Sequence, residues 1–193
     1  MTQILANAVT LTPVPFTPKI IFFDIDDTLS RNGVIAPHNE ATLEQLAKTD
    51  IKLVIATGRS KSIIPDDIMS LLEADVFDAI VCTNGQYNFD KQGVISHYPL
   101  TLEQASKIDE LCRHDHLIHK FDSDKHLAWA NDNEKIRAFA AQNPSAIIDP
   151  DYFKHNPVYQ CSVFFNDERI QMQELDFAAS GLKLVHSHQV GGD

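Results

Sequence analysis

Residues 19–28 read KIIFFDIDDT, and this stretch decides the fold. Residues 20–23 form an unalternating run of β-branched and aromatic side chains, which is typical of a strand covered on both faces in a parallel sheet. The run ends abruptly in three acidic residues, Asp24, Asp26 and Asp27. The sequence therefore predicts a buried parallel strand that carries carboxylates at its carboxyl end.

Helices and further strands alternate after this stretch. The order strand, helix, strand, helix, strand is typical of right-handed βαβ units. It predicts an α/β fold with a Rossmann-like, doubly wound parallel sheet. The expected elements are strands over 19–23, 51–56 and 79–82, with helices over 37–47 and 64–72 between them.

The pattern changes after residue 85. Residues 86–89 and 93–99 flank a polar turn and predict an antiparallel hairpin. Beyond the hairpin the pattern is α+β, which places a domain boundary between 1–98, with an irregular lead-in over 1–18, and 99–193. The second part is expected to hold helices over 101–114, 134–141 and 167–179, and strands over 117–121, 126–130, 158–165 and 182–186.

Composition narrows the function classes. The 193 residues carry 16 Lys and Arg against 27 Asp and Glu, a net charge of −11, which repels phosphate backbones and anionic lipid. We therefore expect no nucleic-acid or membrane partner. The three cysteines, Cys82, Cys112 and Cys161, are far apart in the sequence and indicate reduced thiols in a cytoplasmic protein.

Polar residues follow each of the three strands predicted for the first domain. They are Asp24, Asp26 and Asp27, then Thr57 and Gly58, then Thr83, Asn84 and Gly85. In an open α/β sheet ligands bind outside the carboxyl ends of the strands, so these side chains are expected to meet in one crevice.

The two carboxylates Asp24 and Asp26 can divide the chemistry between attack and proton transfer. Their mutual repulsion favours a hard cation such as Mg²⁺ between them. Thr57 and Gly58 would offer a hydroxyl and open backbone N–H groups to a phosphate. An ordinary solvated turn is the alternative, whereas a calcium loop is excluded because its sixth and twelfth positions would be Leu29 and Ile35.

Together, FFDIDDTL at 22–29, IATGR at 55–59 and TNG at 83–85 resemble the motifs of the haloacid dehalogenase-like phosphatase superfamily. The likeness is greatest to its Cof-type branch, in which an α+β cap is inserted into the core. The resemblance implies that Asp24 is the nucleophile and Asp26 the general acid and base. It also implies that Mg²⁺ is held by Asp24 and the backbone carbonyl of Asp26, and the phosphoryl group by Thr57, Gly58 and Asn84.

One part of the family pattern is missing from this sequence. Family members carry a Lys and a further acidic pair after the cap, and Lys183 is a poor candidate for that Lys. We therefore expect a shortened form of a longer phosphatase. Its first strand would be an exposed apolar edge that invites self-association.

The resulting hypothesis is a Mg²⁺-dependent phosphomonoester hydrolase for a small phosphorylated metabolite, such as a sugar phosphate. The alternatives are a catalytically silent binding or regulatory module and, more weakly, a phosphotransferase or phosphomutase. The cap is expected to move about residues 98–99 and to exclude water. Two minor features have two interpretations each. The four histidines His114, His116, His119 and His126 form either a metal site or a solvated surface. Trp129 and Tyr159 either face the substrate or lie in the core.

Overall fold

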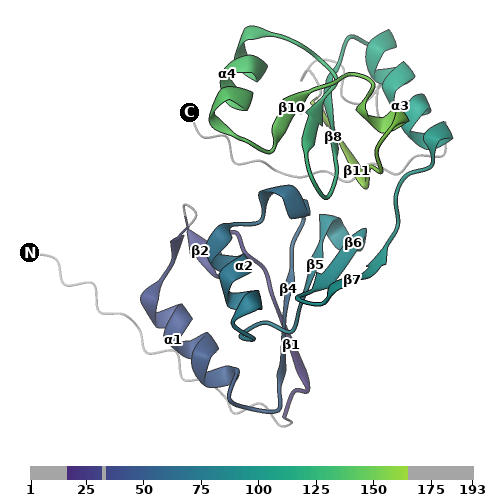
Figure 1. The fold of residues 1–193 in the computed structure, drawn as a ribbon. Helices are drawn as coiled ribbons and strands as arrows, with labels where there is room; N and C mark the ends of the chain where they lie inside the picture. Colours follow the sequence, from purple (N-terminus) through teal and green to yellow (C-terminus); the bar gives the residue numbers. More distant parts are fainter. Residues whose placement is uncertain (1–16, 32–33, 165–193) are drawn as a thin grey trace, which may run out of the picture.

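The computed structural model describes residues 17–31 and 34–164 of the protein, which form a five-stranded and a four-stranded sheet with helices packed against them, and a small two-stranded sheet (Figure 1). The first sheet has the order β1-β4-β5-β6-β7. Its strands are β1 (Ile20–Phe23), β4 (Lys52–Ala56), β5 (Ala79–Cys82), β6 (Tyr87–Asp90) and β7 (Gly93–His97). Strands β1, β4 and β5 run parallel, and the β6–β7 hairpin continues the sheet antiparallel. The α/β class with a Rossmann-like parallel core is confirmed.

Two helices connect the parallel strands. They are α1 (Pro37–Leu46), with its proline in the first turn, and α2 (Asp66–Glu73), which follows the 3₁₀ turn η1 (Lys61–Ile63). Leu43 of α1 and Ile68 of α2 join one buried cluster with Leu53, Ile55 and Ile80 of the strands. The apolar periodicity therefore placed both helices correctly, because each buries its apolar stripe on the sheet.

Strand β1 departs from the expectation that both of its faces are covered. It pairs with β4 alone among the described strands, and Ile20 and Phe22 are 45% and 56% exposed. Ile21 and Phe23, on the opposite face of β1, pack against the core cluster that α1 and α2 join. Self-association through this strand stays a prediction.

We expect Phe22→Lys to weaken any self-association of the 193-residue chain, because a lysine at a sheet edge opposes strand pairing. Light scattering over a range of protein concentrations measures the effect. Val34→Lys is the matched control, since Val34 is 67% exposed but lies outside the five-stranded sheet. A wild-type chain that is monomeric at every concentration would contradict the prediction.

The second sheet has the order β10-β9-β8-β11 and lies above the first in Figure 1. Its strands are β8 (Ile118–Asp122), β9 (Leu127–Trp129), β10 (Ala146–Ile148) and β11 (Gln160–Phe164). Helix α3 (Leu102–His114) begins with a capping box of Thr101 and Gln104, and α4 (Glu134–Gln142) connects β9 to the parallel strand β10. Strand β10 was not predicted, because three apolar residues are too short a pattern to detect.

Three further short elements, β2 (Ser30–Arg31), β3 (Val34–Ile35) and η3 (Tyr152–Lys154), were also missed. The helix expected over 167–179, the strand expected over 182–186 and Lys183 lie outside the described residues, as do residues 1–16 of the expected lead-in.

The two faces of the second sheet differ in character. Cys161 and Val163 of β11 pack with Cys112 of α3 on one face. Residues two apart share a face, so Gln160 and Ser162 lie on the other face, beside Asp122 of the neighbouring strand. That second face is turned toward the part of the chain that holds the five-stranded sheet, because Gln160 contacts Asn84 there. The division into two domains between residues 98 and 99 stays a prediction.

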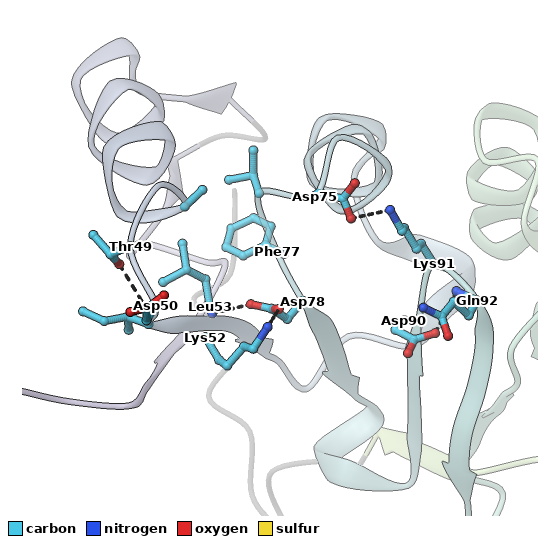
Figure 2. Close-up of a pocket in the computed structure, with 13 residues that line it drawn as sticks. Thr49, Asp50, Lys52, Leu53, Asp75, Phe77, Asp78, Asp90, Lys91 and Gln92 are labelled. Carbon is cyan, nitrogen blue, oxygen red and sulfur yellow. Dashed lines mark hydrogen bonds and ion pairs between the residues drawn. The ribbon is translucent and has the colours of Figure 1, made fainter.

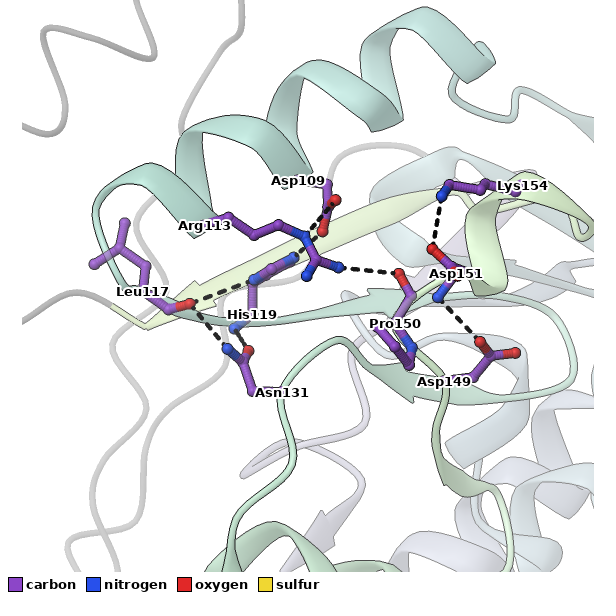
Figure 3. Close-up of polar contacts among 9 residues, drawn as sticks. All are labelled: Asp109, Arg113, Leu117, His119, Asn131, Asp149, Pro150, Asp151 and Lys154. Carbon is purple, nitrogen blue, oxygen red and sulfur yellow. Dashed lines mark hydrogen bonds and ion pairs between the residues drawn. The ribbon is translucent and has the colours of Figure 1, made fainter.

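A buried polar network links α3 to β8 (Figure 3). Asp109 Oδ2 accepts a hydrogen bond from Arg113 Nε at 2.7 Å. The other carboxylate oxygen, Oδ1, lies 3.0 Å from His119 Nε2. His119 is 1% exposed, and its backbone N–H donates to Asn131 Oδ1. The solvated-surface interpretation is thus wrong for His119, and the described residues contain no group of three or more His, Cys, Asp or Glu that could hold a metal.

The two domains touch beside the hairpin exit. Tyr159 packs edge to face on Tyr87, and its hydroxyl lies 3.2 Å from His97 Nδ1. Ser145 Oγ donates to the carbonyl of Ser62 at a second contact. Tyr159 is 4% exposed and joins the core cluster of the first domain, whereas Trp129 stacks on Phe164 on the sheet face that is turned toward that domain.

Candidate functional site

The loops that follow β1, β4 and β5 lie at the same end of the sheet, because the three strands are parallel neighbours. Backbone hydrogen bonds join two of these loops directly. Asn84 N–H donates to the carbonyl of Thr57 at 3.2 Å, and Thr83 N–H donates to the carbonyl of Arg59 at 2.8 Å. Residues 27 positions apart are thus brought into one site, as the sequence pattern predicted for Thr57 and Asn84.

The first loop is a tight turn around a buried anchor. Ile25 is fully buried, and its carbonyl accepts hydrogen bonds from the backbone N–H groups of Leu29 and Ser30. Asp24 is exposed and accepts from Ile25 N–H at 2.8 Å through one carboxylate oxygen. Asp27 has a φ of +56°, a left-handed conformation that Asp tolerates better than most residues. The turn therefore presents the Asp24 carboxylate at the sheet end.

Thr57 and Gly58 form the second loop. Thr57 is 6% exposed, and its hydroxyl oxygen accepts the backbone N–H of Arg59 at 3.2 Å, which leaves its O–H able to donate. A Cβ on Gly58 would lie 3.3 Å from Oδ1 of Asn84. Only a residue without a side chain fits comfortably at this approach, so the glycine keeps the backbone N–H groups of the loop open.

The third loop is the 3₁₀ turn η2 (Thr83–Gly85), in which three consecutive residues have positive φ. The φ angles are +50° for Thr83, +54° for Asn84 and +87° for Gly85. A positive φ raises the conformational energy of a β-branched threonine, so it persists only where contacts with the surrounding structure hold it in place. It places the Asn84 side chain between Gly58 and the second domain.

Arg59 contributes the strongest contact of the site, although the sequence pattern gave it no role. Its Nε and Nη2 donate to the two carboxylate oxygens of Asp26 at 2.9 and 2.7 Å. These hydrogen bonds hold the pKa of Asp26 below its ordinary value; partial burial opposes them and the charge of Arg59 adds to them. The available signal was the position of Arg59, directly after Thr57 and Gly58.

Asp24 and Asp26 supply oxygen ligands of the kind that Mg²⁺ prefers. The Asp26 carboxylate is occupied by Arg59, so its backbone carbonyl is the group left for a metal, in keeping with the expectation from the motif resemblance. The part of the chain that the structure describes offers no third acidic side chain close enough to complete a cluster. The donor chemistry fits Mg²⁺, for which Asp24 would be the side-chain ligand.

A pocket at the opposite end of the sheet does not belong to this site (Figure 2). It is lined by residues at the amino ends of β4 and β5 and by the hairpin turn. Lys52 pairs there with Asp78 at 2.6 Å, and Lys91 pairs with Asp75. Both lysines that line this pocket are thus paired within the protein, and none of the motif residues reaches it.

Cys82 lies immediately before η2 but takes no part in the chemistry. It is fully buried, and burial raises the pKa of its thiol to about 11. A thiol with so high a pKa is a poor nucleophile. Cys82 therefore packs in the core of the first sheet, and all three cysteines of the chain are free.

Comparison with known proteins places these features in context. A family model described as haloacid dehalogenase-like hydrolase matches residues 21–189. No curated protein matches the sequence significantly.

Solved structures match over most of the chain. A sugar phosphatase of haloacid dehalogenase subclass IIB is 22% identical, with a TM-score of 0.67 over 83% of this chain and 64% of that one. A haloacid dehalogenase superfamily phosphatase from Bacteroides thetaiotaomicron is 20% identical, with a TM-score of 0.70 over 95% and 68%.

A hypothetical protein from Geobacillus kaustophilus is 22% identical, with a TM-score of 0.67 over 84% of this chain and 63% of its own. The chain thus spans a little under two thirds of the length of two of these three structures. Identities this low show a shared fold.

Proposed function

Because this chain belongs to the haloacid dehalogenase-like hydrolases, we propose that it is a Mg²⁺-dependent phosphomonoester hydrolase that works through an aspartyl phosphate on Asp24. The observation that supports this proposal best is the meeting of three loops at one end of the sheet. They bring an exposed carboxylate at Asp24 together with a buried hydroxyl at Thr57 and open backbone at Gly58.

The proposed reaction has two displacements. A carboxylate oxygen of Asp24 bonds to phosphorus while the bond from phosphorus to the leaving oxygen breaks, and Asp26 gives that oxygen a proton. Asp26 then takes a proton from water, whose oxygen bonds to phosphorus as the Asp24 carboxylate leaves. Asp24 and the Asp26 carbonyl would hold Mg²⁺, which supplies charge that offsets the repulsion between carboxylate and phosphate.

Arg59 must release Asp26 for the first step. A carboxylate that accepts two hydrogen bonds from a guanidinium is held deprotonated and has no proton to give. The described geometry therefore corresponds to the base form of Asp26. Movement of Arg59 toward the bound phosphoryl group would restore the acid form.

We expect Arg59→Gln to shift the pH dependence of hydrolysis of an alkyl phosphate such as glucose 6-phosphate. Without the guanidinium the pKa of Asp26 rises toward its ordinary value, so the acid form persists to higher pH and the alkaline decline of kcat/KM moves upward. Values of kcat/KM measured from about pH 4 to about pH 9 for the wild type and the variant give the shift of this alkaline decline.

Arg31→Gln is the control for the loss of a nearby positive charge. Arg31 Nε lies 3.8 Å from Asp27 Oδ1, and the Arg31 side chain is 87% exposed, so its ion-pair partner is Asp27 rather than Asp26. A pH profile that moves equally in the two variants would show that general charge, rather than the Arg59 hydrogen bonds, sets the pKa of Asp26.

The substrate is proposed to be a small phosphorylated metabolite such as a sugar phosphate, bound under an α+β cap of the Cof type. One of the similar structures is described as a sugar phosphatase, which supports this substrate class.

A cytoplasmic location is proposed from the free thiols. None of the described helices is long and apolar enough to cross a membrane.

Two other functions remain as alternatives. A silent binding or regulatory module would keep the phosphate loops without turnover, and a phosphotransferase or phosphomutase would pass the same aspartyl phosphate to an acceptor other than water. The direct test is Mg²⁺-dependent release of p-nitrophenol from p-nitrophenyl phosphate that is lost in Asp24→Asn. Analysis of the product formed with a sugar acceptor present separates hydrolysis from transfer.

A further inference from the structure

The side-chain amide of Asn84 is held in one orientation by the second domain. Its Nδ2 donates a hydrogen bond to Oε1 of Gln160, on β11, at 2.8 Å. Its Oδ1 is the amide atom nearer to Gly58: it lies 3.3 Å from the point where a Cβ on Gly58 would be, against 3.8 Å for Nδ2. Asn84 thus turns its carbonyl oxygen toward Gly58 of the phosphate loop, while its amide nitrogen is engaged by Gln160.

The direction of this amide follows from Asp122. The Asp122 side chain is 4% exposed and pairs with Lys120, so it is a carboxylate that can only accept hydrogen bonds. Gln160 Nε2 donates to Asp122 Oδ2 at 3.3 Å, and Ser162 Oγ donates to the same oxygen at 2.9 Å. Gln160 must therefore turn its nitrogen to Asp122.

The remaining orientations are then determined. With its nitrogen on Asp122, Gln160 offers only its carbonyl oxygen to Asn84. Asn84 must meet that oxygen with its own nitrogen, which leaves Oδ1 facing Gly58. A buried carboxylate on β8 thereby sets the polarity of a side chain in the phosphate site of the other domain.

This orientation is unfavourable for a phosphoryl group. Phosphate oxygens accept hydrogen bonds, and they are stabilised by N–H donors and opposed by a carbonyl oxygen that points at them. We propose that Gln160 and Asp122 are positioning residues that act through Asn84, and that full phosphate binding exchanges the Asn84–Gln160 hydrogen bond for one from Asn84 to phosphate. The proposal rests on the proposed function, because it takes the phosphate site to be at Thr57 and Gly58.

Because of this exchange, the contact of β11 with Asn84 and the binding of phosphate at the site compete with each other. Coupling of this kind is reciprocal, so bound phosphate also weakens the contact between β11 and the 3₁₀ turn η2. The state with Asn84 bonded to Gln160 and the state with Asn84 bonded to phosphate differ by one hydrogen bond. Such a difference corresponds to a change of about 2- to 10-fold in the affinity for phosphate.

The test is Gln160→Leu, which removes both polar atoms of the side-chain amide, Oε1 and Nε2, at similar volume. We expect the inhibition constant of inorganic phosphate against p-nitrophenyl phosphate hydrolysis to fall by about 2- to 10-fold, with calorimetry as an independent measure of phosphate binding. Gln142→Leu is the matched control, at the exposed last residue of α4. Damage to the fold would weaken phosphate binding, so a gain in affinity distinguishes positioning from a structural role.

A second variant tests whether the effect passes through Asn84. In the Gln160→Leu background, Asn84→Ala should remove the whole gain in phosphate affinity. The proposal is overturned if Gln160→Leu leaves the phosphate affinity unchanged or lowers it, or if the gain survives Asn84→Ala. Should Gln160→Leu fail to fold, Gln160→Met supplies an unbranched side chain of similar length with the same expected result.

The proposed function and this inference can fail separately. Absence of p-nitrophenyl phosphate hydrolysis argues against the hydrolase, while calorimetry with inorganic phosphate still decides the role of Gln160. Hydrolysis with equal phosphate constants in the wild-type chain and Gln160→Leu keeps the hydrolase and removes the inference. Absence of phosphate binding in both proteins overturns the inference as well.

Discussion

We expect Asp24→Asn to lower the rate of p-nitrophenyl phosphate hydrolysis by about 1000-fold or more. The amide of asparagine is a poor nucleophile and cannot form the mixed anhydride of the two proposed displacements. The substitution would also remove a negative ligand from the proposed Mg²⁺ site. The measurement is the release of p-nitrophenol by wild-type and variant chains at saturating Mg²⁺.

Asp27→Asn is the matched control for this substitution. It makes the same chemical change three positions further along, at an exposed residue whose positive φ asparagine also tolerates. The control should keep its activity to within about twofold, because most surface substitutions have small effects. Activity that survives in Asp24→Asn would rule out the proposed nucleophile, and an inactive wild-type chain that still binds phosphate would favour the silent binding module.

The second large effect is expected in the stability of the second domain. Asp109→Ala removes the acceptor shared by His119 and Arg113 and leaves the buried imidazole without its carboxylate partner (Figure 3). Leaving a buried polar group without its hydrogen-bond partner typically costs about 1–3 kcal/mol of unfolding free energy. Urea unfolding followed by tryptophan fluorescence measures the loss, since Trp129 is the sole tryptophan and lies in this domain.

Asp132→Ala provides a control with the same chemistry at the surface. Asp132 accepts two hydrogen bonds from Arg137 at 2.7 and 2.9 Å, but its side chain and that of Arg137 are 49% and 67% exposed. Exposed ion pairs contribute about 0–1 kcal/mol, so this variant should unfold close to the wild type. Equal losses in the two variants would show that burial of the Asp109 network is not what stabilises the domain.

Much of the fold could be predicted because it is encoded locally. Each strand of the five-stranded sheet and each described α-helix lies where the apolar pattern predicted it. The strands that escaped prediction, β2, β3 and β10, are only two or three residues long and are defined by their pairing with another strand.

The sequence by itself determined which strands end in the candidate site residues, since parallel strands bring their carboxyl ends to one edge whatever the details of packing. Only the tertiary structure decided what those residues touch. Arg59 meets Asp26 from 33 positions away, and Gln160 meets Asn84 from 76 positions away in the other domain. Local periodicity specifies which face a side chain occupies, but the polar group opposite it, and hence the protonation of Asp26 and the direction of the Asn84 amide, depends on how distant segments pack together.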